Sequence, residues 1–146
     1  MIKPYTPGHF DDWVRLRIAL WPDETLEEHR RYAASILERP EDAAVYLASE
    51  ADGNVVAFAE RTLRRDYVNG CSSSPVGFLE GLYVRPPFRR CGLARLLCKA
   101  LEGWAKEKGC REFASDVLLH NEVGQRLHEG LGFSETDRVV YYKKQL

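Results

Sequence analysis

Residues 78–95 read FLEGLYVRPPFRRCGLAR, and the other elements of the chain are considered outward from them. This stretch opens as an apolar, strand-like run, breaks at Pro86-Pro87, and continues through a turn that contains arginines and Gly92. A strongly periodic helical pattern begins directly after that glycine. Because the backbone N–H groups and the dipole of a helix N-terminus attract anions, and arginines add charge-assisted bonds, this stretch predicts a phosphate-binding turn.

The bulk composition limits the class of protein. A chain of 146 residues is long enough for a core without disulfides, so we expect one domain over residues 1–146. Its 21 Lys and Arg against 22 Asp and Glu give no nucleic-acid-binding signature. No signal peptide opens the chain, and no apolar run approaches the roughly 18 residues of a membrane span. We therefore expect a cytoplasmic protein that binds neither nucleic acid nor membrane.

The cysteines do not form a metal-binding pattern. Cys71, Cys91, Cys98 and Cys110 contain no CxxC pair and have no histidine at ligand spacing. We expect free thiols in a reducing compartment and no metal site.

Hydrophobic periodicity predicts the other elements of a mixed α/β domain. Strands are expected at residues 2–5, 44–49, 55–63 and 111–118, in the apolar run from Phe78, and in a last segment through residues 139–142. Helices are expected at residues 9–20 and 25–38, between Gly92 and a C-cap at Gly109, and after an N-cap at Asn121. The order along the chain is β-α-α-β-β-β-α-β-α-β.

Residues 89–94 match the pattern R-x-x-G-x-A, between a strand and a helix and upstream of Asn121. In this context the pattern resembles the GNAT superfamily of acetyl-CoA-dependent N-acetyltransferases. The resemblance implies the GNAT fold, with a central mixed, mostly antiparallel sheet flanked by helices, and acetyl-CoA as the co-substrate. It assigns a set of cofactor-binding residues: Leu82, Tyr83, Val84, Arg89, Arg90, Cys91, Gly92, Leu93, Ala94, Arg95 and Asn121. Simple helix capping is an equally good role for Asn121.

A finer resemblance covers nearly the whole chain. It rests on a series of short motifs in one order: Leu20-Trp21-Pro22, Asp66-Tyr67-Val68-Asn69-Gly70-Cys71, Ser73-Ser74-Pro75, Phe78-Leu79-Glu80-Gly81, Gly109-Cys110-Arg111-Glu112, Ala114-Ser115-Asp116 and Gly132-Phe133. Together they resemble the aminoglycoside 6′-N-acetyltransferases, bacterial enzymes that acetylate the 6′-amine of antibiotics such as kanamycin and tobramycin.

This resemblance implies a pocket for a polycationic acceptor. It assigns Trp21, Tyr67 and Asp137 to the substrate, and places Glu80 and Asp116 where both can meet the reacting amine. Because an alkylamine is mostly protonated at neutral pH, a nearby carboxylate must accept or relay its proton, and Asp116 is favoured for that role. The residues also have plainer roles, in the core for Trp21, as a loop cap for Asp116 and as a solvated position for Glu80.

Three positions depart from the pattern of the family. Glu24 stands where a histidine is common and would add a carboxylate for the cationic substrate. Asp137 replaces a common glutamate. His128 occupies the place of a tyrosine that protonates the departing thiolate in many GNAT enzymes, and a histidine without a catalytic role fits there at least as well.

Two other functions remain open on the sequence alone. The acceptor could be a polyamine or a protein amine, since acidic pockets suit any cationic amine. The chain could also be a non-enzymatic acetyl-CoA-binding module, which would need the arginines but not Glu80, Tyr67 and Asp116. The resemblance further suggests a homodimer, and residues 139–142 could form an edge strand that pairs across a two-fold axis.

Overall fold

The computed structural model describes all residues from 1 to 146. It contains one five-stranded sheet in the order β1-β2-β3-β4-β5. Its strands are β1 (Ile2–Pro4), β2 (Ala43–Ser49), β3 (Val55–Arg64), β4 (Val76–Val84) and β5 (Phe113–Ser115). Its helices are α1 (Phe10–Leu20), α2 (Leu26–Leu37), α3 (Leu93–Glu107) and α4 (Glu122–Leu131), with single 3₁₀ turns at Pro7–His9 and Pro86–Phe88. The mixed α/β class expected from the sequence is confirmed.

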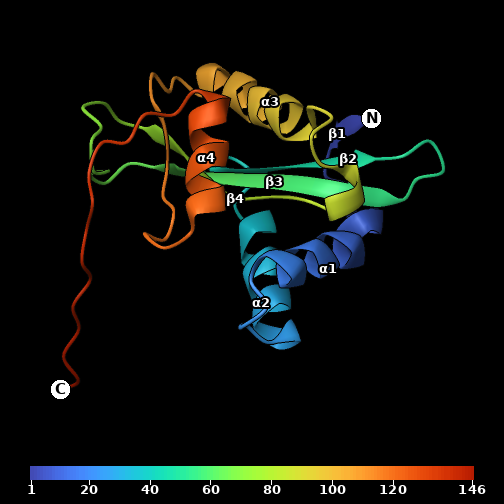
Figure 1. Cartoon of the computed structure of the whole chain (residues 1–146), viewed down its shortest axis with the longest axis horizontal. Helices are drawn as coiled ribbons and strands as arrows, with labels where there is room; N and C mark the ends of the chain where they lie inside the picture. Colours follow the sequence, from blue (N-terminus) through green and yellow to red (C-terminus); the bar gives the residue numbers. More distant parts are fainter.

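The helices cover both faces of the sheet (Figure 1). On one face α1 and α2 bury Trp13, Val14 and Ile36 against Val45 and Phe58 of the sheet. On the other face α3 buries Leu97 and Leu101 against small and aliphatic residues of β3 and β4. The central strand β3 is therefore buried on both sides along nearly its whole length, as a strand between two helical layers must be.

The pairing of β4 changes along its length. It runs antiparallel to β3 from Val76 to Val84, but it pairs in parallel with β5 only from Gly77 to Leu79. Beyond Ser115 the β5 chain leaves the sheet. Residues 80–84 of β4 therefore have a partner strand on one edge only, and the opposite edge lies open at the fork between the two strands.

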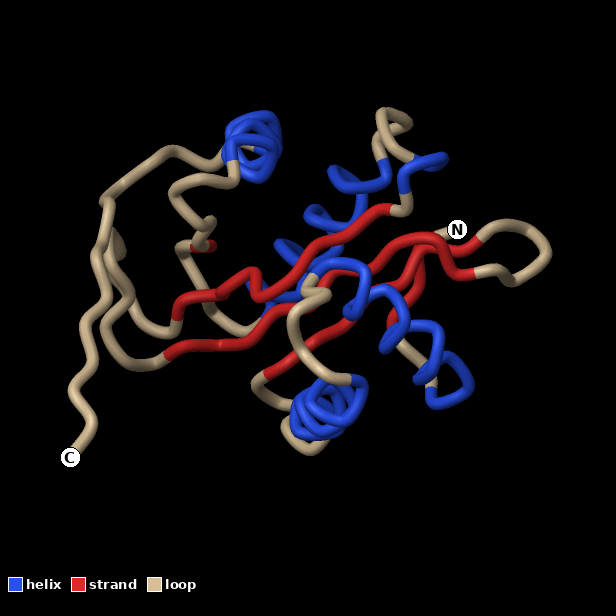
Figure 2. Tube along the Cα trace, turned by 60° about the horizontal axis from the view of Figure 1, so that its bottom comes forward, coloured by secondary structure: helices blue, strands red, loops and turns tan.

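The prediction of a last strand through residues 139–142 is wrong. No regular element follows α4, and the segment after Phe133 runs past the β3–β4 loop and away from the body of the molecule (Figures 1 and 2). The side chains expected to lie in that strand are exposed, from 49% for Val139 to 92% for Tyr142. A strand forms only against a partner, and no strand of this chain lies beside the segment. The strand expected at residues 111–118 is also shorter, at Phe113–Ser115, because β4 pairs with it over three residues.

The cysteines, the length of the helices and the grouping of metal-ligating side chains can also be read from the structure. All four cysteines are free thiols, and burial raises the pKa of Cys98 to about 12, so its thiol stays protonated. None of the helices combines the length and apolar character that crossing a bilayer requires. No three His, Cys, Asp or Glu side chains gather closely enough to hold a metal ion.

Candidate active site

The N-terminus of α3 forms one end of the site. Gly92 is its N-cap, with φ of +86°, a conformation that a side chain strongly disfavours. No side chain caps this end, and the first turn holds no acidic residue. The first-turn N–H groups of a 15-residue helix are thus left to face an anion. Space does not explain the glycine, because a Cβ there would meet no atom within 4 Å.

The arginines of the turn are partly engaged by the protein itself. The Arg89 Nε donates to the Val84 carbonyl at 2.8 Å, and its guanidinium lies 5.5 Å from the centre of the Tyr83 ring. The Arg95 Nη2 donates to the Gly130 carbonyl at 2.8 Å and so ties α3 to α4. Arg90 is exposed and has φ of 64°, unusual for a residue with a side chain. The sequence expectation that these groups surround a phosphate is compatible with their place at the helix start.

Glu80 stands at the other end of the open edge. In the β3–β4 ladder Glu60 pairs with Gly81 and Arg61 pairs with Leu79, so Glu80 is the extra residue of a β-bulge. Bulges re-aim side chains, and here the carboxylate is turned toward the α1 and α2 side of the sheet. It accepts a hydrogen bond from the Thr62 Oγ1 at 2.6 Å and stays largely buried, with 16% of the side chain exposed.

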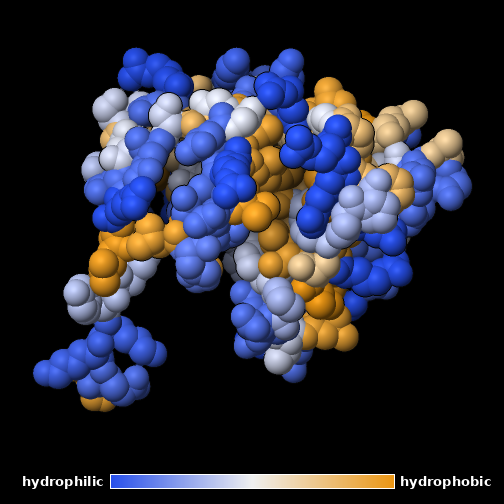
Figure 3. All heavy atoms as spheres, viewed as in Figure 1, coloured by the Kyte–Doolittle hydropathy of each residue, from blue (hydrophilic) through white to orange (hydrophobic).

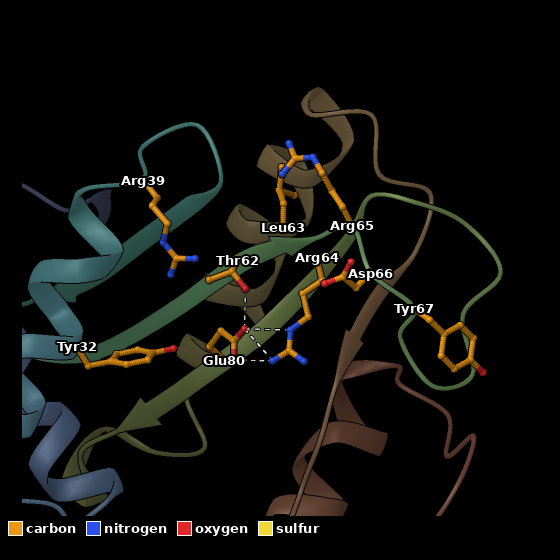
Figure 4. A pocket seen from close by; sticks show the side chains of 9 residues that line it. All are labelled: Tyr32, Arg39, Thr62, Leu63, Arg64, Arg65, Asp66, Tyr67 and Glu80. Atoms are coloured by element: carbon orange, nitrogen blue, oxygen red, sulfur yellow. Dashed lines mark hydrogen bonds and ion pairs between the residues drawn. The ribbon is translucent and has the colours of Figure 1, made fainter.

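Glu80 faces a cleft of about 440 Å³ (Figure 4). Nine residues from α2, the segment after α2, β3, β4 and the β3–β4 loop line it: Tyr32, Arg39, Thr62, Leu63, Arg64, Arg65, Asp66, Tyr67 and Glu80. The Arg64 Nη2 donates to both carboxylate oxygens of Glu80, at 3.0 and 3.1 Å, and the guanidinium lies 3.5 Å from the centre of the Phe78 ring. The cleft therefore holds arginines as well as carboxylates, so it differs from the purely acidic lining that suits a cationic substrate.

Asp116 approaches the same fork from β5. The last parallel pair is Leu79 with Ser115, so Glu80 and Asp116 each follow that pair by one residue. Glu80 lies in the bulge and Asp116 follows the end of β5, so both carboxylates lie where the regular pairing of the two strands ends. Asp116 is exposed and no hydrogen bond joins it to Glu80. Both residues therefore follow the last paired positions of the fork, but Asp116 is not among the residues that line the cleft at Glu80.

Trp21 lies beside the bulge. It follows α1 directly, and its ring packs edge-on against Phe58 at 6.5 Å. A Cβ on Gly81 would lie 2.5 Å from the Trp21 Cη2, so the glycine makes room for this ring. Trp21 is therefore part of the core as well as a wall of the fork. Glu24 does not point at Glu80; its Oε2 lies 3.7 Å from the Nδ1 of the buried His29.

The remaining predicted acceptor residues lie farther out. Tyr67 lines the cleft but is 81% exposed, and Figure 4 shows its ring pointing away from Glu80. Asp137 is exposed on the C-terminal segment, where its Oδ1 accepts from the Arg138 N–H at 2.8 Å. That segment does touch the β3–β4 loop, because a Cβ on Gly70 would lie 2.4 Å from Thr136.

Asn121 and His128 have clear structural partners. The Asn121 Oδ1 accepts from the Gly124 N–H at 3.0 Å, which is the capping role expected for it. The His128 Nδ1 lies 2.7 Å from the Gly124 carbonyl, to which it must donate, and its Nε2 lies 2.7 Å from the Ser115 Oγ. The Nδ1 contact lies within α4, and the Nε2 contact joins α4 to the end of β5.

The sequence reasoning missed most of the cleft. Arg64 and Arg65 form a charged pair at the end of β3, directly before the motif that begins at Asp66, and this charge pattern is visible in the sequence. Tyr32 and Arg39 carried no such signal, because only the packing of α2 on the sheet brings them opposite Glu80.

Comparison with known proteins agrees with this geometry. Residues 9–133 match the model of the acetyltransferase (GNAT) family. The aminoglycoside N(6′)-acetyltransferase type 1 of Serratia marcescens is 51% identical over 138 residues, covering 94% of each chain. The enzyme of the same name from Salmonella typhimurium is 45% identical over 144 residues, covering 99% of this chain and 98% of its own.

Solved structures show the same likeness. The structure of AAC(6′)-Iy in complex with the bisubstrate analog CoA-S-monomethyl-acetylneamine has a TM-score of 0.92 at 42% identity, covering 100% of this chain and 98% of the other. The apo 6′-N-acetyltransferase AAC(6′)-IG of Acinetobacter haemolyticus has a TM-score of 0.94 at 41% identity, covering 100% and 99%. The chain belongs to the GNAT family of acetyltransferases, within its group of aminoglycoside 6′-N-acetyltransferases.

Proposed function

We propose that this chain transfers the acetyl group of acetyl-CoA to the 6′-amine of an aminoglycoside, and so inactivates the antibiotic. One observation carries the proposal: on a single strand, the open edge at residues 80–84 joins the phosphate-binding turn to the carboxylate of Glu80. The relatives with CoA and a CoA–neamine analog bound support the same pair of substrates.

The cofactor would lie along this open edge. Its pyrophosphate would face the N–H groups at the start of α3, where Gly92 permits the turn. Its pantetheine arm would hydrogen-bond to the backbone of Leu82, Tyr83 and Val84 on the edge that faces away from β3, as an added strand does. Apolar residues are visible on this face between α4 and the layer of α1 and α2, where the arm would pass (Figure 3).

The acceptor amine would meet the acetyl group at the fork. Asp116 would bind the ammonium form and take or relay its proton, and Glu80 would orient the amine. Attack on the thioester would form an oxyanion, which a backbone N–H of residues 82–84 would stabilise. The amine nitrogen gains the acetyl group as the C–S bond breaks and CoA leaves as a thiolate. His128 is a poor acid for that thiolate, because Ser115 and Gly124 occupy both its ring nitrogens.

The assembly would be a homodimer. The exposed Val139, Val140, Tyr141 and Tyr142 have the β-branched and aromatic character of a strand but no partner in their own chain. In a second copy they could pair with an open strand edge, since β5 ends the sheet and is paired on one side only. Light scattering tests this: the expected mass is twice 16.7 kDa, and a monomer at micromolar concentration contradicts it.

The test of function is release of free CoA thiol from acetyl-CoA with a panel of amines. Kanamycin and tobramycin should give higher kcat/KM values than spermidine or a basic peptide. Higher values with spermidine or the peptide would favour the alternative acceptor class. Release of no thiol with any amine would favour a binding module and refute the proposal.

A further inference from the structure

A buried ion pair lies beneath the fork and has no part in the proposed chemistry. Arg17 of α1 is 2% exposed and Glu60 of β3 is 0% exposed. The Arg17 Nη1 donates to the Glu60 Oε1, and the Trp13 Nε1 donates to the Oε2 at 2.9 Å. Burial raises the pKa of Glu60, and the Arg17 charge opposes that rise.

Stability alone is a weak reason for such a pair. Removing two charges from water costs about as much as their attraction returns, and apolar side chains of similar volume often serve as well or better. The Arg17 Nε also has no hydrogen-bond partner, which adds to the cost. The position of the guanidinium therefore calls for a second explanation.

The guanidinium lies against three aromatic rings, of which Trp13 is the most distant, at 6.0 Å from the ring centre. The Arg17 guanidinium carbon lies 4.7 Å from the centre of the Trp21 ring and 4.4 Å from that of Tyr32. Trp21 follows α1 and Tyr32 lies in α2, so one cation fixes rings from two separate elements. His29 also holds Trp21 in place. The Trp21 carbonyl accepts a hydrogen bond from the buried His29 Nε2 at 2.9 Å, and the Trp21 ring stacks on the His29 ring.

Both rings border the place where the acceptor would bind. Tyr32 lines the cleft in front of Glu80, opposite its carboxylate in Figure 4, and burial followed by the Glu80 charge raises the pKa of its hydroxyl. Trp21 covers Gly81, the residue after Glu80. The Arg17 charge behind these rings also weakens their attraction for another cation on the front. They therefore suit the apolar face of a sugar ring, while the ammonium groups go to the carboxylates.

We infer that Arg17, held by Glu60, is a positioning residue for the acceptor: it keeps Trp21 and Tyr32 as a fixed aromatic wall beside Glu80. The inference rests on the proposed function for the identity of the acceptor. Acetyl-CoA would bind along the far part of β4, so its affinity should not depend on this wall.

The test is the double variant Arg17→Met with Glu60→Gln, which removes both charges at similar volume and keeps an acceptor for Trp13. We expect the KM for kanamycin to rise roughly tenfold, from loss of a buried cation–π contact, with kcat and the KM for acetyl-CoA changed by less than about twofold. Arg61→Met is the matched control. Arg61 is also 0% exposed and lies over Trp104 and Phe113, but on the α3 face of the sheet.

A kanamycin KM within about twofold of the unchanged chain, or an equal rise in Arg61→Met, would overturn the inference. Thermal unfolding by circular dichroism sets a temperature at which all variants are folded. If the double variant does not fold, Arg17→Lys keeps the charge but loses the planar group, and should raise the same KM about threefold; no rise there overturns the inference as well.

A spectroscopic measurement separates this inference from the proposed function. The indole N–H resonance of Trp21, assigned with Trp21→Phe, should be sharp in the unchanged chain and broadened in the double variant without any substrate. An unchanged line would refute the positioning role, whereas failure of the unchanged chain to acetylate kanamycin would refute only the proposed function.

Discussion

The two ends of β4 are built in different ways. The cofactor end uses backbone groups that are neighbours in sequence: the open edge of residues 82–84, the turn and the first N–H groups of α3. The acceptor end uses side chains from α2, β3, β4 and a loop, gathered around Glu80 by the fold. A ligand shared by a whole family can be held by backbone, whereas selection of one acceptor needs side chains that vary independently.

The largest expected effect belongs to the acceptor end. Asp116→Ala should lower kcat/KM for kanamycin by about 100-fold to 10,000-fold, because the amine loses the group that accepts its proton. The Kd for CoA, measured by calorimetry, should be unchanged. Asp12→Ala, which removes a carboxylate paired with Arg15 on α1, should alter kcat/KM by less than about twofold. If kcat/KM falls by less than about tenfold in Asp116→Ala, Asp116 is not the group that accepts the proton of the amine.

At the cofactor end the sensitive position is Gly92. Gly92→Ala places a side chain at a φ of +86°, which costs about 1 kcal/mol or more and distorts the turn. We expect the KM for acetyl-CoA to rise roughly tenfold while that for kanamycin is unchanged. The matched control is Gly103→Ala, a helical position with no atom within 4 Å of the added Cβ, where alanine should stabilise α3. A change in the kanamycin KM instead would break the separation between the two ends.

A smaller effect is expected at Arg64, whose side chain is 43% exposed and paired with Glu80. Arg64→Gln removes a positive charge from the cleft and frees Glu80 for an ammonium group. We therefore expect the KM for kanamycin to fall about threefold, as suits a partly exposed pair. Steady-state kinetics at low and high salt measure this. A rise in KM would mean that Arg64 instead holds Glu80 in its working position.

The difference between the two ends also explains what the sequence could predict. The turn and α3 follow from local periodicity and from the glycines at the two ends of the helix, so residues 78–109 were sufficient to place them. Tyr32 and Arg39 reach the cleft through the packing of α2, and the Glu80 bulge depends on the register between β3 and β4. No local pattern reports either feature. The strand expected at residues 139–142 failed for a related reason, since strand propensity does not supply a partner.

The smallest effect tests the loop that carries Tyr67. The Glu112 carboxylate accepts from the Ser73 hydroxyl and from the N–H groups of Ser72 and Ser73, and these bonds lower its pKa below the ordinary value of 4.5. Its contribution to stability is therefore present at neutral pH and lost as the pH falls through the lowered pKa. Glu112→Gln should reduce the Tm more at pH 7 than at pH 3. The exposed Glu107→Gln is the control, and an equal Tm loss at both pH values contradicts the account.

Two ligands that differ only at the 6′ position test whether the acceptor group is the 6′-amine. Neamine carries an amine at the 6′ position, and paromamine carries a hydroxyl there with the rest of the molecule unchanged. With purified protein and acetyl-CoA, we predict release of one thiol per neamine and a mass gain of one acetyl group on it, with no release for paromamine. Equal release with both compounds, or none with neamine, would contradict the account.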